Sequence, residues 1–94
     1  DKMLDIAKVH TLFETILRLE TMEECENFFR DLMTISEIEA ITERWEVVKL
    51  IDQGIPYRRI SEQTGASTAT ITRIAHWLKH GMGGYRMMLD REKS

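Results

Sequence analysis

The sequence predicts an all-α fold, and we expect residues 1–94 to form one small domain of six helices. Apolar residues recur every three or four positions along most of the chain, which is typical of amphipathic helices. Helix formers are plentiful, only one Pro and five Gly occur, and no segment shows the alternation of a strand. A hydrophobic content of 43% excludes a disordered tail.

The first predicted helix lies within residues 3–20. Its apolar residues form an arc wider than one small domain needs for its own core, which indicates contact with a second subunit. The residues of this arc are Ile6, Val9, Leu12, Phe13, Ile16, Leu17 and Leu19.

Two capping boxes predict where the next two helices begin. In residues 21–24, and again in residues 34–37, a Thr is followed three positions later by a Glu, so each side chain satisfies a backbone N–H of the first turn. The second of these helices should run to about Asp52 and end at Gly54. The expected inward residues are Cys25, Phe28, Phe29 and Leu32 in the first helix, and Ile38, Ile41, Trp45, Val48 and Ile51 in the second.

Residues 57–80 predict a helix-turn-helix, around which the rest of the chain is organised. Pro56 stands at or just before the start of its first helix. Gly65 falls where a helix ends with a left-handed backbone, and Ser67 is the expected N-cap of the second helix. The residues expected to pack the two helices together are Ile60, Ala66, Ile71 and Ile74.

The outer face of the second helix in this motif is the expected DNA-binding surface. It begins with small hydroxyl and methyl groups, which let a helix enter a major groove and meet base edges. Cations follow, and Arg58 and Arg59 of the first helix add to them; these groups suit contacts with phosphates. The predicted DNA-binding residues are Arg58, Ser67, Thr68, Ala69, Thr70, Thr72, His76 and Lys79.

The charge of the chain is divided unevenly, although its net value is −3. Residues 1–54 hold six Lys and Arg against 13 Asp and Glu, for a net charge of −7. Residues 55–80 hold four against one, for +3, and residues 81–94 hold three against two, for +1. Because phosphates repel the acidic part, DNA should approach through the basic segment only.

Residues 80–84, HGMGG, predict a flexible break, and the glycine-rich part at 81–84 predicts a hinge or a helix cap. A phosphate-binding loop is excluded because this glycine-rich stretch follows a helix and lacks the Lys of such a loop. A last short helix is expected around residues 85–91, with Tyr85, Met88 and Leu89 as its docking face.

The sequence indicates no enzyme and no cofactor. Cys25, the only Cys, fits a small core residue better than a nucleophile. His76 and His80 stand four positions apart, as two metal ligands on one helical face would. No third ligand lies near them in the sequence, so we expect no metal site.

The same bulk features predict a cytoplasmic protein. A single Cys suits a reducing compartment, no apolar run reaches the length of a membrane span, and no signal peptide is visible. The sequence leaves open whether Asp1 and Lys2, which precede Met3, are native.

Residues 33–79 resemble the tryptophan repressor family, and in particular its Trp-repressor-like YerC/YecD group. The motifs that carry this resemblance are TxxExEA(I/L)xxR at residues 34–44 and GAxxATITR at residues 65–73. The resemblance implies an intertwined homodimer whose N-terminal helices interlock with those of the partner. It also implies that two recognition helices enter successive major grooves, about 34 Å apart.

The resemblance further implies an effector site, because two arginines and nearby threonines of the family hold a tryptophan corepressor. The matching positions here are Thr34, Arg44, Thr70 and Arg73. Ile74, however, stands where the family has a glycine beside the indole ring, and Trp77 where it has a serine near the amino group. A close-packed pocket cannot absorb this added volume, so we expect no familiar tryptophan binding. The protein would be constitutively competent or would respond to another small anion.

We therefore expect a bacterial transcription regulator, a repressor that binds a symmetric operator as a homodimer. The alternative is a helical protein-interaction module that retains the helix-turn-helix shape without binding DNA, which the acidic N-terminal half favours. A more remote alternative is a helical enzyme subunit with metal chemistry at His76 and His80.

Overall fold

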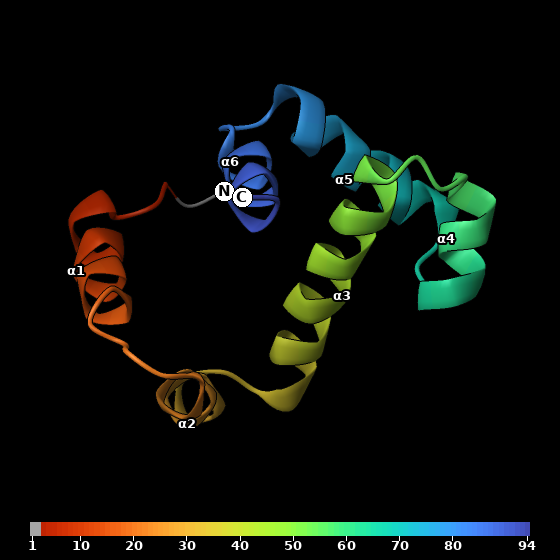
Figure 1. Ribbon diagram of the computed structural model, residues 1–94. Coiled ribbons are helices and arrows are strands. Elements are labelled where there is room, and N and C mark those ends of the chain that lie inside the picture. Colours follow the sequence, from red (N-terminus) through yellow and green to blue (C-terminus); the bar gives the residue numbers. More distant parts are fainter. Residues whose placement is uncertain (1–2) are drawn as a thin grey trace. The chain divides into compact units, whose positions relative to one another are not determined.

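The computed structural model describes residues 3–94, so Asp1 and Lys2 lie outside the described part. All regular structure in this range is helical, which confirms the predicted all-α class (Figure 1). The chain divides into two compact units, one ending at Ile35 and one from Ser36 to Ser94. The single domain over residues 1–94 stays a prediction. The helices are α1 (Ile6–Ile16), α2 (Met22–Leu32), α3 (Ile35–Asp52), α4 (Tyr57–Thr64), α5 (Thr68–His80) and α6 (Gly84–Glu92).

Helix α1 lies within the predicted segment 3–20 and leaves residues at both ends of that segment outside the helix. It begins after Asp5, whose carboxylate accepts a hydrogen bond from the Lys8 backbone N–H (3.3 Å). It ends at Ile16, and turn hydrogen bonds follow it. Thr21 then adopts an extended conformation (φ −132°, ψ 161°) as the N-cap of α2.

The start of α2 confirms the first capping box, except that one of its two hydrogen bonds comes from a different backbone N–H. The Thr21 hydroxyl accepts from the Glu24 backbone N–H (3.1 Å). The Glu24 carboxylate accepts from the backbone N–H of Glu20 (2.9 Å), one residue earlier than the motif requires. One donor of the first helical turn and one backbone N–H just before the helix are thereby satisfied. The corresponding box before α3 stays a prediction.

The first unit leaves its apolar residues largely uncovered in this chain. Neither α1 nor α2 contains a buried residue. Leu17 is 82% exposed and Met22 is 84% exposed. Cys25, Phe28 and Phe29 are only half-buried, and Leu32, which we expected inward, is exposed. Two short helices alone offer too little partner surface to cover such side chains.

Helix α3 buries residues only in its C-terminal half. Val48 is fully buried, as predicted, but Val47, which lay outside the predicted stripe, is fully buried as well. Adjacent residues of a helix point about 100° apart, so the face that this half of α3 presents to the core is wide enough to bury both. Of the other predicted positions, Ile38, Trp45 and Ile51 are half-buried. Ile41 is 42% exposed, so that part of the prediction was wrong for the single chain.

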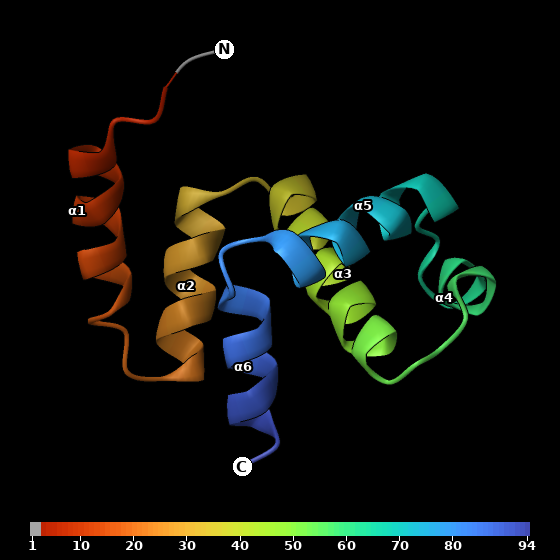
Figure 2. The same cartoon turned by 90° about the horizontal axis from the view of Figure 1, so that it is seen from above.

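The core of the second unit joins α3, α4, α5 and α6. It is built from Val47, Val48, Ile60, Ala66, Ile71, Ile74 and Leu89. Figure 2 shows α5 crossing α3, with α4 before one end of α5 and α6 after the other. Helix α6 agrees with the predicted segment, but its predicted docking face is buried only at Leu89, while Tyr85 is half-buried and Met88 is exposed.

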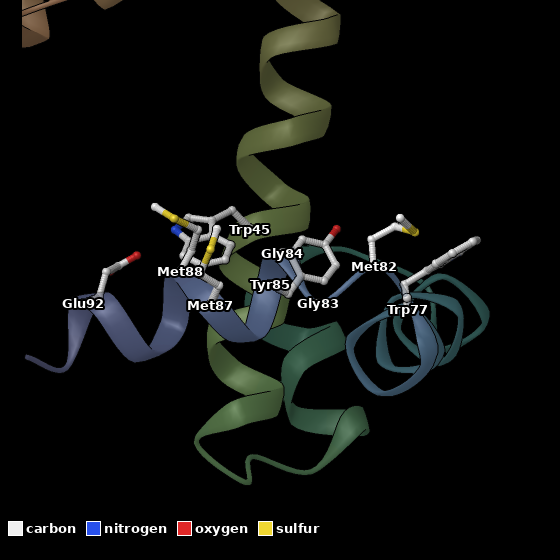
Figure 3. Close-up of a pocket in the computed structure, with 10 residues that line it drawn as sticks. Trp45, Trp77, Met82, Gly83, Gly84, Tyr85, Met87, Met88 and Glu92 are labelled. Atoms are coloured by element: carbon white, nitrogen blue, oxygen red, sulfur yellow. The ribbon is translucent and has the colours of Figure 1, made fainter. Parts of the chain in front are cut away.

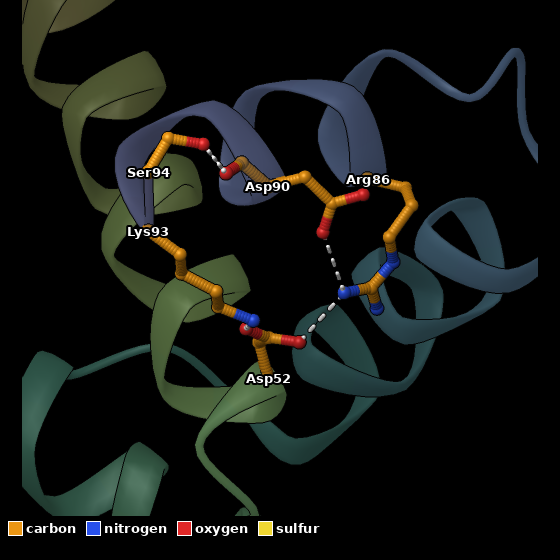
Figure 4. A network of polar contacts seen from close by, with 5 residues as sticks. All are labelled: Asp52, Arg86, Asp90, Lys93 and Ser94. Carbon is orange, nitrogen blue, oxygen red and sulfur yellow. Dashed lines mark hydrogen bonds and ion pairs between the residues drawn. The ribbon is translucent and has the colours of Figure 1, made fainter.

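A carboxylate at the end of α3 holds α6 in place (Figure 4). Oδ2 of Asp52 lies 2.7 Å from Nζ of Lys93, and Oδ1 accepts a 2.9 Å hydrogen bond from Nη1 of Arg86. These two hydrogen bonds, with that of Lys93 the larger effect, lower the pKa of Asp52 below its ordinary value of 3.8 against a smaller opposing effect of burial. The ionised form of Asp52 therefore fixes α6 to α3.

Candidate nucleic-acid interface

The turn between α4 and α5 is held by backbone and side-chain hydrogen bonds. Gly65 adopts the left-handed conformation predicted for it (φ 83°) and donates from its N–H to the Ser61 carbonyl oxygen (2.9 Å). The Ser61 hydroxyl donates to the Ala66 carbonyl oxygen (2.6 Å). The Thr64 hydroxyl donates to the Ile60 carbonyl oxygen (2.8 Å) and accepts from the Ala66 N–H (3.1 Å). These bonds fix the angle at which α5 leaves the turn.

The sequence reasoning missed the two hydroxyls that brace this turn, Ser61 and Thr64. The signal was present, because Ser and Thr in a last helical turn readily bond to backbone groups nearby. Their partners, however, depend on the course of the chain after Gly65. Only the folded turn brings the Ala66 carbonyl oxygen to the Ser61 hydroxyl.

Ser67 begins α5 as the predicted N-cap. Its Oγ accepts a hydrogen bond from the Thr70 backbone N–H (3.1 Å) and donates to the Thr70 hydroxyl (3.0 Å). This pairing orients the first turn of the helix. The Ser67 hydroxyl, which we predicted to contact DNA, is thus already hydrogen-bonded within the first turn of α5.

One side of α5 is locked into the core. Ile71, Ile74 and Ala75 are buried, as are Ile60 of α4 and Ala66 of the turn, which confirms the predicted packing of the two helices. Ile60 and Ile71 are fully buried. Because close-packed side chains resist displacement, α5 is presented as a rigid element.

The opposite side of α5 is open to solvent. Of the predicted contact residues on this helix, only Thr70 is half-buried, and the others are exposed. The Thr72 hydroxyl donates to the Thr68 carbonyl oxygen (2.9 Å), so it can only accept a further hydrogen bond. The exposed residues of this face, which we call the α5 outer face, are Thr68, Ala69, Thr72, Arg73, His76 and Lys79.

Arg58 lies on α4 with a highly exposed side chain. Its Nε is 3.6 Å from Oε1 of Glu62, one helical turn later. An exposed pair of this kind is weak, so a phosphate could replace the carboxylate as its partner. Arg58 is therefore available to an anion, which must first displace the weak ion pair with Glu62.

The residues matched to a family effector site lie in both units. Thr34 belongs to the first unit, whereas Arg44, Thr70 and Arg73 belong to the second. Arg44 and Arg73 are exposed. Ile74, in place of the family's glycine, is part of the buried core.

Trp77 does not join this core. It is 55% exposed and lines a groove of about 630 Å³ with Trp45, Tyr85 and residues around α6 (Figure 3). Its backbone carbonyl approaches Gly81 so closely that a Cβ at Gly81 would overlap it. The sequence reasoning missed this groove, because the glycines and methionines that complete it are separated from Trp45 by more than thirty residues. The further lining residues are Gly81, Met82, Gly83, Gly84, Met87, Met88 and Glu92.

Residues 7–93 match the family described as Trp repressor protein. The chain belongs to the Trp repressor family. This family member is 48% identical over 82 residues to the uncharacterized protein YerC of Bacillus subtilis, an alignment that covers 87% of this chain and 79% of that protein.

Solved structures of related proteins have the same fold as this Trp repressor family member. A TrpR-like protein from Eubacterium eligens is 40% identical with a TM-score of 0.89, covering 93% of this chain and 90% of that one. A candidate Trp repressor from Staphylococcus aureus is 46% identical with a TM-score of 0.87, covering 93% and 87%. The predicted family resemblance and the all-α Trp-repressor-like fold of the chain are confirmed.

Family membership also bears on the class of protein. Members of this family are regulatory DNA-binding proteins and not enzymes, in agreement with the prediction from the sequence. Among residues 3–94, no three His, Cys, Asp or Glu side chains gather as a metal site. Within the same range, no helix has the length and apolar character needed to cross a membrane.

Proposed function

We propose that this chain is a sequence-specific DNA-binding transcription regulator, a repressor that binds a symmetric operator as a homodimer. Helices α4 and α5 act as its helix-turn-helix, and the α5 outer face enters the major groove. The observation that carries the proposal is the division of α5 into two sides, since one side is locked by Ile71 and Ile74 while the other exposes small hydroxyls followed by cations.

Along the α5 outer face, small side chains lie where the helix would reach the bases, and cations lie where it would reach the phosphates. Thr68 and Ala69 lie in the first turn, where a helix inserted by its N-terminus reaches base edges. Lys79 lies in the last turn, where the phosphates of the groove wall are in reach. Arg58 supplies a second phosphate contact from α4.

The homodimer is supported by the uncovered apolar surface of the first unit. Side chains such as Phe13, Leu17 and Met22 are more than half exposed in the single chain, and burial of apolar surface is the main favourable term in association. A second copy presents the same surface and can cover it by two-fold symmetry. Two copies also provide the paired recognition helices that a symmetric operator needs.

The dimer is tested by a charge placed on this apolar surface. Leu17→Glu should shift the chain toward monomer in analytical ultracentrifugation, because a carboxylate cannot be buried there without a partner. Thr11→Glu adds the same charge to an exposed polar position of α1, the helix that precedes Leu17, and should leave the dimer intact. An unchanged sedimentation profile for Leu17→Glu would count against this interface.

DNA binding is tested by selecting sequences from a random pool and measuring fluorescence anisotropy at two salt concentrations. Arg58→Ala and Lys79→Ala should weaken all sequences alike and each lower the salt slope by about one. Thr68→Ala should instead reduce the preference for the selected sequence. Lys8→Ala and Thr15→Ala on α1 are matched controls and should change neither quantity.

The result also separates this function from that of a protein-interaction module. A module that retains only the helix-turn-helix shape would form no complex with DNA at either salt concentration. A complex with the same affinity for selected and random DNA would show phosphate binding without sequence readout. Either outcome contradicts the proposed regulator.

We further propose that tryptophan is not the effector. Ile74 is buried in the core, so the volume beside it is already filled by protein. Arg44 and Arg73 remain exposed and suit a small anion. The regulator is therefore active without tryptophan, or it answers to another anionic molecule.

A further inference from the structure

Two imidazole rings lie side by side on α5. The ring centroids of His76 and His80 are 5.0 Å apart, with an angle of 47° between the ring planes. Both side chains are exposed. The edge of the His76 ring also meets the indole of Trp77, with centroids 6.2 Å apart and planes at 82°. The sequence spacing alone gave two residues on one face, but the structure brings their rings together.

We propose that His76 and His80 chelate one divalent transition-metal ion, with water in the remaining coordination positions. A Zn²⁺–N bond is about 2.0–2.1 Å long, and the ring centroid lies about 1.1 Å beyond the nitrogen. Two imidazoles on one ion therefore have centroids about 4.5 Å apart at a 90° angle and about 5.2 Å apart at a tetrahedral angle. The observed 5.0 Å falls within this range.

To share one ion, each ring must turn one nitrogen toward a common point. Since α5 is anchored by its buried side, the second imidazole binds as an intramolecular ligand at a high effective concentration. Neutral imidazole suits Cu²⁺, Ni²⁺ and Zn²⁺, whereas Mg²⁺ prefers oxygen ligands. Binding should be strongest for Cu²⁺ and absent for Mg²⁺.

The charges around the pair act in opposite directions. Lys79 lies between the two histidines in sequence, and Arg73 lies one turn before His76; both repel a cation. His80 is the last residue of α5, where the carbonyl end of the helix favours positive charge. The site is therefore of moderate strength and exchanges its ion readily.

An ion held here would also add positive charge to the α5 outer face. This consequence depends on the proposed function, while metal binding itself does not. Because the pair lies near the end of the helix that carries Lys79, the ion should strengthen phosphate contact and raise DNA affinity severalfold. The ion would thus act as a positive effector at a position distinct from Arg44.

Metal binding is tested by calorimetry with Zn²⁺ on the full chain without a histidine tag. We expect one ion per chain. His76→Ala or His80→Ala should lower the affinity for Zn²⁺ by at least about tenfold. His10→Ala on α1 removes an equivalent exposed imidazole and should leave binding unchanged. Circular dichroism confirms that the variants are folded. Equal binding by the wild type and the double variant would overturn the site.

Electron paramagnetic resonance with Cu²⁺ gives an independent readout. The spectrum should show two coordinating imidazole nitrogens in the wild type and one in each single variant. A single nitrogen in the wild type would contradict chelation, whatever the calorimetric affinity.

The link to DNA is tested by anisotropy at fixed salt, with Zn²⁺ or with a chelator. Zn²⁺ should raise the DNA affinity of the wild type and leave that of the double variant unchanged. Zn²⁺ binding with no change in DNA affinity would overturn the effector role and support only the metal site. No DNA binding in either condition would contradict the proposed function, and calorimetry would still decide the metal site.

Discussion

Arg86 of α6 donates a 2.9 Å hydrogen bond from Nη1 to Oδ1 of Asp52, the last residue of α3. The other oxygen of the same carboxylate lies 2.7 Å from the Lys93 ammonium. Only 12% of the Asp52 side chain is exposed. One carboxylate thus fixes the C-terminal helix through two cations, and α6 in turn places Leu89 in the core beneath α5.

Replacement of this carboxylate should loosen α6. Asp52→Asn keeps the shape of the side chain but removes the charge that binds Arg86 and Lys93, so we expect a melting temperature several degrees lower. Asp90→Asn is a matched control. Asp90 is exposed, and its ion pair with Arg86 is long (3.9 Å) and therefore weak. Equal melting temperatures for both variants would show that the Asp52 bridge does not stabilise the fold.

The same carboxylate predicts a pH dependence. The pKa of Asp52 is lower in the folded chain than its ordinary value of 3.8. Its contribution to the free energy of unfolding is therefore complete above that value and is lost as the pH falls through the lower, folded-state pKa. Urea unfolding of the wild type and Asp52→Asn should differ at pH 6 and converge at about pH 2. If the free energies of unfolding of the two proteins still differ at the lowest pH, the charge of Asp52 is not the cause of the difference.

The N-cap of α5 should matter for stability more than for DNA. Ser67→Ala removes the acceptor of the Thr70 N–H, and loss of such a cap costs about 1 kcal/mol. Ser67→Asn restores an acceptor and should recover most of this loss. Chemical unfolding measures the effect. Full stability of Ser67→Ala would mean that water replaces the cap at no cost.

The buried side of α5 should be sensitive to the loss of one methyl group. Ile71 is fully buried, and Ile→Val in such a position costs about 0.5–1.5 kcal/mol. Thr72→Ser also removes one methyl group from the same helix, but from its exposed side, so its cost should be close to zero. Chemical unfolding of both variants compares the two sides directly, and similar losses would contradict the assigned burial.

Tryptophan should show no micromolar binding in a calorimetric titration. Ile74 fills the core where the family leaves room for an indole ring, and Trp77 adds further bulk. Trp77→Ser removes one of the two obstacles and should still bind poorly, because Ile74 remains. Micromolar binding by the unmodified chain would show that the argument from side-chain volume is wrong.

The α4–α5 segment was predicted from the sequence almost residue by residue. Gly65 and Ser67 act locally, through a left-handed backbone angle and a capping hydroxyl, so their roles follow from their neighbours in the chain. The same holds for the Thr21 cap of α2. The resemblance of residues 33–79 to the family, also visible in the sequence, is confirmed by the match over residues 7–93.

The tertiary structure alone decided which apolar residues are buried and which distant charges meet. Val47 and Val48 are both buried in the core, whereas the three- and four-residue spacing selected only Val48. Asp52 meets Arg86 and Lys93 across more than thirty residues, and no local rule selects that carboxylate. The sequence by itself determined helices, caps and the turn, since these depend on neighbours along the chain. Burial and long-range ion pairs depend on how helices pack in space, and so they required the fold.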